Sequence, residues 1–107
     1  MPVVGDQIQY DGAFLNGSGV PISGLTDVVI TIYNHSGTAV ATAQPCTEIS
    51  SSGIYRYSLS GSNVTGVGDY VGLMSTSTAT VPFKKIVLSE SVTGATAVDV
   101  AAIADAV

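Results

Sequence analysis

Short runs of apolar and β-branched residues make up most of this chain, and glycine-rich turns interrupt them at roughly ten-residue spacing. In the clearest run, Val28, Ile30 and Ile32 fall two residues apart and so share one face of a pleated strand. The predicted strands cover residues 7–15, 27–33, 38–44, 54–59, 70–75 and 80–89, with a kink at Gly12 in the first and with Lys84 and Lys85 near the middle of the last. Strands this short and this regularly spaced predict an all-β fold of about seven antiparallel strands, either a sandwich or a barrel.

The C-terminal residues have the pattern of a helix instead of a strand. Val100, Ile103 and Val107 follow the spacing of one helix face, and the alanines around them favour a helix. A helix of about three turns is not stable alone in water, so we expect it to dock on its own domain or on neighbouring subunits. The predicted organisation is a β-sandwich domain over residues 1–93 and a short helical segment over residues 94–107.

The charge balance argues against nucleic acid as a partner. The chain has 3 Lys and Arg against 8 Asp and Glu, for a net charge of −5, and phosphate binding needs a basic patch. Charged residues make up only 10% of the chain and hydrophobic residues 46%, which is little surface charge for a free monomer. Uncharged surface that the core does not need is often covered by a partner, so the composition predicts a subunit of an assembly.

The sequence also carries expectations about compartment and redox state. The N-terminal residues have neither a basic region nor an apolar core of a secretory signal, and no apolar run is long enough to span a membrane. We therefore expect synthesis in the cytoplasm. Cys46 is the only cysteine, so no disulfide forms within the chain. We expect Cys46 to be a small buried hydrophobe, with a reactive thiol as the alternative.

Few residues are suited to catalysis or to metal binding. His35 stands in a predicted hairpin turn without a patterned carboxylate or nucleophile, so we expect a solvated loop histidine. Asp6, Asp11 and Asp27 are scattered, and we expect them to cap turns, with Ca²⁺ held by the early loops as the alternative. We predict no cofactor and no metal, and no enzymatic activity, because no general base stands near an activated nucleophile.

The tyrosines supply most of the large amphipathic side chains. We expect Tyr55, Tyr57 and Tyr70 to pack in the core with their hydroxyls near its rim. Tyr10 and Tyr33 are candidates for an interaction surface, either with a protein or, as a strip, with sugar rings. The three apolar positions of the C-terminal helix complete the set of candidate contact residues.

Several segments taken together resemble a known family. They are YDGAFLN at 10–16, GVPISGL at 19–25, VVITIY at 28–33, GIYRY at 53–57 and GDYVG at 68–72. This order, over about residues 10–75, resembles the Ig-like or prealbumin-like β-sandwiches of tailed-bacteriophage virion proteins and of bacterial surface repeats. The alanine- and aspartate-rich end of the chain is similar to the segment that follows such domains in phage structural proteins. The shared positions are structural, so the resemblance implies an Ig-like antiparallel sandwich and transfers no site residue.

The family implies a passive role in a virion. The expected function is that of a bacteriophage structural protein, above all a capsid decoration or cement protein that stabilises the shell through subunit contacts. Its expected partners are the major capsid protein or other virion proteins and further copies of itself, a trimer by symmetry, with neither nucleic acid nor membrane. The expected location is the virion, after synthesis in the host cytoplasm. The alternative is a receptor- or carbohydrate-binding module of a tail fibre, neck or surface protein.

Overall fold

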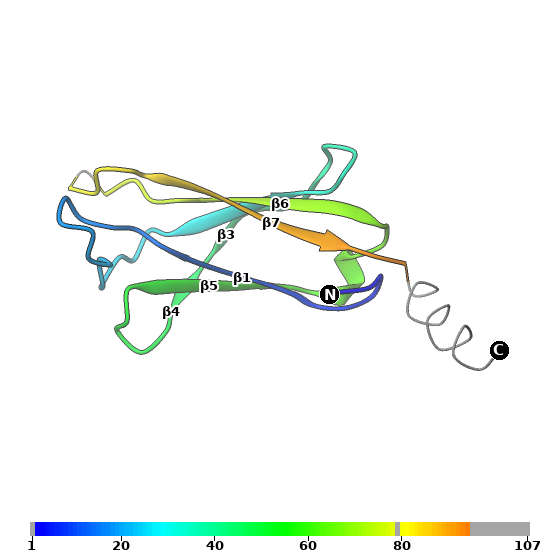
Figure 1. Ribbon diagram of the computed structural model, residues 1–107, viewed down its shortest axis with the longest axis horizontal. Helices are drawn as coiled ribbons and strands as arrows, with labels where there is room; N and C mark the ends of the chain where they lie inside the picture. The colour runs from blue at the N-terminus through cyan, green and yellow to red at the C-terminus, as the bar shows by residue number, and fades with distance from the viewer. Residues whose placement is uncertain (1, 79, 95–107) are drawn as a thin grey trace.

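The computed structural model describes residues 2–78 and 80–94, and in these residues the chain folds into two antiparallel sheets (Figure 1). The strands are β1 (Ile8–Ala13), β2 (Val29–Tyr33), β3 (Ala39–Pro45), β4 (Thr47–Glu48), β5 (Ile54–Leu59), β6 (Gly68–Ser75) and β7 (Lys85–Val92), with one 3₁₀ turn, η1 (Gly61–Asn63). One sheet has the order β1-β5-β4 and the other the order β3-β2-β6-β7. The prediction of an all-β antiparallel fold is confirmed.

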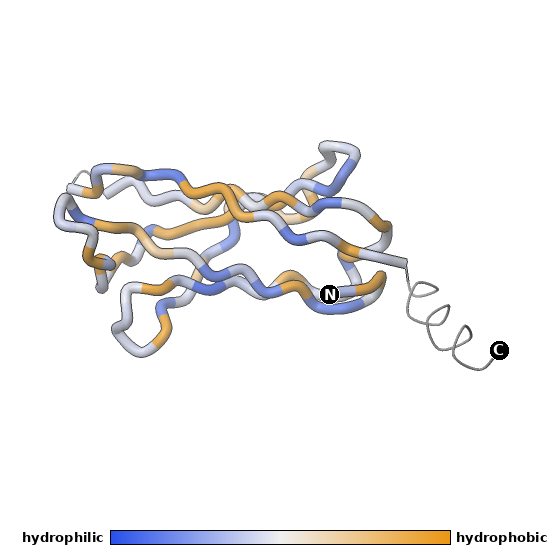
Figure 2. Tube along the Cα trace, viewed as in Figure 1, coloured by the Kyte–Doolittle hydropathy of each residue, from blue (hydrophilic) through white to orange (hydrophobic). Residues whose placement is uncertain are grey.

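The two sheets form two layers that face each other across one core. Residues from both layers point into it, and the following side chains are nearly inaccessible to solvent: Ile8, Tyr10, Phe14, Val28, Ile30, Ile32, Tyr55, Leu59, Val64, Tyr70, Met74, Val81 and Val92. Apolar and polar segments alternate along the strands in Figure 2, as expected for strands with one face buried. Burial of this apolar surface is the main favourable contribution to folding.

The β2–β3 hairpin forms where the sequence predicts it. The side-chain oxygen of Asn34 accepts hydrogen bonds from the backbone N–H groups of Ser36 and Thr38, both at 3.0 Å. Gly37 has φ of 81°, in the left-handed region that glycine adopts without strain. The pairing between β2 and β3 shifts register twice, and Ala43 has φ of 47° at this irregular edge.

The predicted kink at Gly12 is wrong. Pairing of β1 with β5 runs without a break from Ile8 opposite Leu59 to Ala13 opposite Ile54. Gly12 instead provides room between the sheets, because a Cβ atom at this position would lie 3.0 Å from the Met74 sulfur. The glycine thus reflects a close approach of the two layers.

The predicted position of the last strand is also wrong. β7 begins at Lys85, so Lys84 and Lys85 lie at its start instead of its middle. Val81 is buried before the strand begins, and its N–H donates to the Thr78 carbonyl in a turn. Pro82 follows, and it has no N–H group to donate to a neighbouring strand. The chain therefore begins to pair with β6 only after this turn.

The two ends of the described chain meet at one place. Val3 and Thr93 form a parallel bridge, so the N-terminal residues run beside the end of β7. The predicted C-terminal helix, with Val100, Ile103 and Val107, lies outside the described residues, and the boundary at residue 93 remains a prediction.

Candidate interaction face

The outer face of the three-stranded sheet is polar apart from Ile54, which is 37% exposed at one end of β5. Asp11 on β1 lies directly opposite Arg56 on β5, and the guanidinium donates two hydrogen bonds to the carboxylate, at 2.7 and 3.1 Å. These bonds hold the pKa of Asp11 below its ordinary value. Gln9 and Ser58 are exposed on the same face. This is the pattern of a sheet that has one face on the core and the other in water.

The outer face of the four-stranded sheet is richer in apolar side chains. The strand register brings the outward side chains of β2, β6 and β7 into three rows: Tyr33, Val71 and Ser89; Thr31, Leu73 and Val87; and Val29, Ser75 and Lys85. Val87 is 68% exposed and Tyr33 39% exposed, and their apolar neighbours on β2 and β6 are half-buried. We call these nine residues the outer face.

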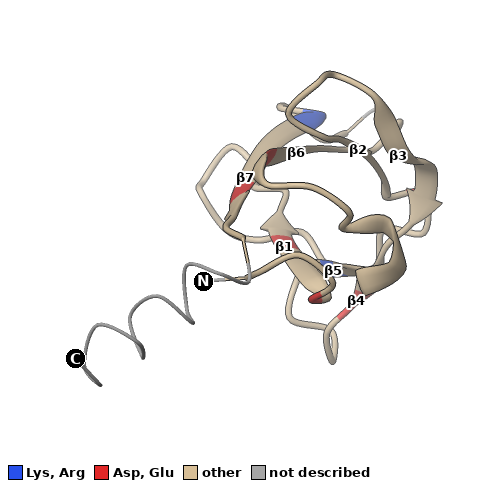
Figure 3. Ribbon diagram, turned by 90° about the vertical axis from the view of Figure 1, so that its right-hand side faces the viewer, with Lys and Arg blue, Asp and Glu red and all other residues tan. Residues whose placement is uncertain are grey.

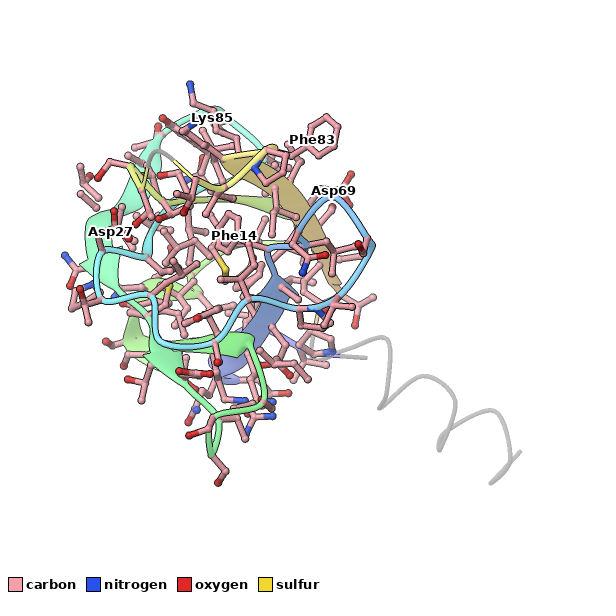
Figure 4. All side chains as sticks on the ribbon, turned by 90° about the vertical axis from the view of Figure 1, so that its left-hand side faces the viewer. Phe14, Asp27, Asp69, Phe83 and Lys85 are labelled. Atoms are coloured by element: carbon pink, nitrogen blue, oxygen red, sulfur yellow. The ribbon has the colours of Figure 1, made fainter. Side chains whose placement is uncertain are left out.

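Charge is confined to the ends of this surface. Lys85 lies at one end of the β6–β7 pair, and Asp69 lies just beyond the other end, where it accepts a hydrogen bond of 2.8 Å from the Ser91 hydroxyl. β2 and β3 carry no charged residue, and most of the ribbon in Figure 3 is uncharged. Phe83, in the loop before β7, is 79% exposed and points outward near Lys85 in Figure 4. A surface of this kind typically contacts another protein.

Tyr10 does not belong to an interaction surface, so this prediction is wrong. Tyr10 is 2% exposed and its hydroxyl donates to the Tyr70 carbonyl at 2.8 Å, between the two layers. Burial raises its pKa. Tyr33 stands on the outer face, at the end of β2. Because the two tyrosines belong to different sheets and only one reaches solvent, they form no strip for sugar rings.

The aspartates have structural partners. The Asp27 carboxylate accepts hydrogen bonds from the Thr76 hydroxyl at 2.5 Å, the Ser77 N–H at 2.9 Å and the Thr78 hydroxyl at 3.0 Å. These bonds hold its pKa well below its ordinary value and fix the chain after β6. Asp6 accepts from the Val3 N–H at 3.0 Å, as expected for a turn cap. Residues 2–78 and 80–94 contain no group of three His, Cys, Asp or Glu side chains that could hold a metal ion.

His35 and Cys46 occupy structural positions. His35 lies exposed in the β2–β3 hairpin loop, as predicted, where the ring nitrogen is 3.4 Å from the Ser36 hydroxyl. Cys46 is half-buried, and burial raises the pKa of its thiol to about 11. A thiol with a raised pKa carries little thiolate at neutral pH, so the structure favours the packing role over the reactive one.

Two open depressions lie away from the outer face. One of about 450 Å³ is beside β4 and is lined by Pro45, Thr47, Glu48, Ile49, Arg56, Tyr57 and Ser58. Another of about 400 Å³ lies between the N-terminal segment, β1 and β7 and is lined by Pro2, Asp6, Gln7, Ile8, Gln9 and Glu90. In the first, the Glu48 oxygens already accept hydrogen bonds from Gly24 and Gly53, so this carboxylate joins two loops.

Comparison with known proteins assigns no family to the chain: no family model, no curated protein and no solved structure matches it. Among the residues that the structure describes, no helix is long and apolar enough to cross a membrane. The geometry therefore offers one candidate surface, the outer face of the four-stranded sheet, and the chemistry of that surface is apolar contact.

Proposed function

We propose that this chain is a structural protein of a bacteriophage virion and, more specifically, a capsid decoration protein. It attaches to other virion proteins through the outer face. The observation that carries the proposal is the contrast between the two sheets. One outer face has an ion pair and polar side chains, with Ile54 as its exposed large hydrophobic residue, whereas the other presents exposed Tyr33 and Val87 beside half-buried Leu73. The role is mechanical and involves no enzymatic step.

The apolar face supplies binding energy in a form that suits a shell protein. Each Å² of apolar surface that a partner covers contributes about 25 cal/mol before the costs of association. The backbone that carries the outer face is held in a four-stranded sheet, so the backbone loses little conformational freedom on binding. A net charge of −5 and only 3 basic residues disfavour nucleic acid as the partner and leave protein surfaces such as the major capsid protein.

The Ig-like form of the sandwich belongs to the same proposal. Ig domains contain a feature called the tyrosine corner. A tyrosine near the start of a strand, just after the chain has crossed from one sheet to the other, hydrogen-bonds through its hydroxyl to the backbone a few residues upstream. Tyr70 has this position in β6: its hydroxyl donates to the Gly66 carbonyl at 3.0 Å and accepts from the Gly66 N–H at 3.2 Å. This corner supports the Ig-like assignment that the sequence resemblance implies.

Capsids assembled without the chain provide the test. The purified protein is mixed with them, and binding and the melting temperature of the shell are measured. We expect the wild type to bind and to raise that temperature, and the double variant Val71→Lys with Leu73→Lys to do neither. Ser58→Lys, on the polar face of the other sheet, is the matched control and should behave as wild type. Circular dichroism and thermal unfolding establish that each variant is folded.

The proposal fails if the folded double variant decorates shells as well as the wild type does. It fails equally if the wild type binds no capsid and leaves shell stability unchanged.

A receptor- or carbohydrate-binding module is the second candidate. The depression beside β4 supports it, because Tyr57 offers a half-buried ring and Arg56 a hydrogen-bond donor along its wall. A glycan array tests it: this candidate predicts binding that Tyr57→Ala abolishes. An array without signal, together with shell binding, rejects it in favour of the structural role.

A further inference from the structure

Within residues 2–78 and 80–94, the outer edge of β7 has a row of backbone groups without partners. The Lys84 carbonyl accepts from the Thr76 N–H on the β6 side, whereas the N–H and the carbonyl of Thr93 both bond to the N-terminal segment on the other side. Backbone groups alternate in direction along a strand, and β7 pairs with β6 without a register shift. Lys85, Val87, Ser89 and Ser91 therefore direct their N–H and carbonyl groups away from β6, and within the described residues none of these groups has a hydrogen-bond partner.

The other sheet edges are shorter or irregular. β4 has two residues, β1 has six, and β3 has register shifts and ends at Pro45. β7 has eight residues, no proline and no bulge. Of the features by which edge strands usually avoid pairing, it has only two charged side chains, Lys85 at its start and Glu90 on its inner side. An edge of this kind accepts another strand through its main chain.

We propose that the free edge of β7 pairs with β7 of a second copy, in antiparallel orientation, about a two-fold axis at Leu88. We call this β7–β7 interface the joint. This register places Val87 opposite Ser89 and Lys85 opposite Ser91 of the second copy, so every free group of the edge gains a partner. The pairing adds about eight backbone hydrogen bonds, two for each of the four opposed pairs. Self-association of this kind goes beyond the proposed function, and it rests on the strand edge, not on capsid binding.

The side chains on both sides of the joint suit this register. On the outer side, Lys85 comes opposite Ser91 of the second copy. Because the Ser91 hydroxyl bonds to Asp69 of its own copy, the positive charge of Lys85 is brought near the negative charge of that aspartate. On the inner side, Leu88 and Ile86 are half-buried hydrophobics packed against the core, and Leu88 meets its own copy at the axis. Glu90 faces Ile86 of the second copy beside the open depression near the N-terminus, where its carboxylate keeps access to water.

The two outer faces become continuous across the joint, because Val87 lies in the same row as Leu73. The pair would therefore present one larger apolar surface to a shell, in place of the three-fold arrangement expected from symmetry alone.

Disulfide trapping tests the register. In the proposed pair, position 88 faces itself in a non-hydrogen-bonded pair with Cα atoms about 4.5 Å apart, a separation that a disulfide bridges. Position 87 lies about 8 Å from its own copy, too far for a disulfide, although Val87 is the more exposed side chain. In a Cys46→Ala background, we expect Leu88→Cys to form covalent dimers under mild oxidation at least about tenfold faster than Val87→Cys.

A backbone variant adds a second readout. The N–H of Ser89 points away from β6, so Ser89→Pro leaves the native ladder intact and removes a donor from the joint. It should abolish cross-linking of Leu88→Cys, whereas Ser89→Ala should preserve it. Sedimentation of wild-type protein should show dimers that Ser89→Pro converts to folded monomers.

Cross-linking of Val87→Cys as fast as of Leu88→Cys would overturn the proposal, because it would indicate random collision or face-to-face packing of the outer faces. Full cross-linking of Leu88→Cys in the presence of Ser89→Pro would also overturn it. Neither result depends on whether capsids bind the protein, so failure of this proposal and failure of the proposed function are separate outcomes.

Discussion

At the scale of single residues, the hydroxyls of buried tyrosines bond to backbone groups of other segments and so connect the core to them. Tyr10 donates to the Tyr70 carbonyl across the layers. Tyr55 donates to the Ile22 carbonyl at 2.7 Å and accepts from the Leu25 N–H at 3.0 Å, which fixes the long connection before β2. A buried polar group without a partner is costly, so each of these bonds allows a large ring to be buried without that cost.

Tyr70→Phe should destabilise the fold. Without the hydroxyl, both the N–H and the carbonyl of Gly66 lose their partner, and we expect a loss of about 1–3 kcal/mol in the free energy of unfolding. Tyr57→Phe is the matched control: no hydrogen bond of its hydroxyl is found within the described residues, so its change should be about 0.5 kcal/mol or less. Urea denaturation of both variants measures the difference, and equal losses would contradict the assigned role of the corner.

Asp27 should make stability depend on pH in the acid range. Hydrogen bonds from Thr76, Ser77 and Thr78 lower its pKa from 3.8 in the folded state. A group with a lowered folded pKa stabilises the fold above its unfolded pKa, and this contribution is lost as the pH falls below that value. The melting temperature of Asp27→Asn should therefore be lower than that of wild type at pH 7, with the gap shrinking as the pH falls below about 3.8. A gap that stays constant down to pH 2 would show that the carboxylate charge is not what matters.

The burial of Tyr10 could have been predicted from its own strand. Ile8 and Tyr10 alternate with Gln7 and Gln9, which is the pattern of a strand with its apolar side on the core. The burial of Tyr55 and Tyr70 followed from the same pattern and is confirmed.

At the scale of elements, two loops at one end of the molecule depend on a glycine. Gly68, at the start of β6, has φ of 121°, and a Cβ atom there would lie 2.6 Å from the Cβ of His35 in the β2–β3 hairpin loop. The close approach packs the hairpin loop against the start of β6. His35 thus has a packing role next to the tyrosine corner.

Gly68→Ala should loosen this contact. The strained backbone and the clash with His35 together should cost about 1–3 kcal/mol, and hydrogen exchange should quicken in the hairpin loop. Gly66→Ala is the control from the same loop, because its nearest neighbour, the His35 ring, would be 3.9 Å away. The interpretation is wrong if Gly66→Ala perturbs hairpin exchange as strongly as Gly68→Ala does.

Strands were predictable where alternation or β-branched residues were strong, and less so at the ends. β2 and β5 lie within or at the predicted ranges because their side chains alternate clearly in burial. β4 has only two residues and owes its existence to pairing with β5, which no local pattern indicates. The start of β7 was misplaced because Val81 and Phe83 continue the apolar run, although only Val81 enters the core.

At the scale of the whole molecule, polar and apolar side chains are distributed unevenly between the outer faces of the two sheets. Composition alone predicted that some surface would be covered, but not which one. The runs around β2 and β6 are apolar on both sides, and only the strand order joins their outward residues into one surface with β7. The candidate face therefore depends on pairing between segments distant in the sequence, which periodicity does not encode.

The most direct test of the proposed contact surface is oxidative footprinting of the protein, free and mixed with capsids, with Tyr33 and Ile54 as reporters. The two side chains are similarly exposed in the isolated chain, at 39% and 37%, but Tyr33 lies on the outer face and Ile54 on the other sheet. We expect Tyr33 to become protected on the capsid while Ile54 keeps its reactivity. Unchanged reactivity of Tyr33 together with protection of Ile54 would contradict the claim that the four-stranded sheet is the contact surface.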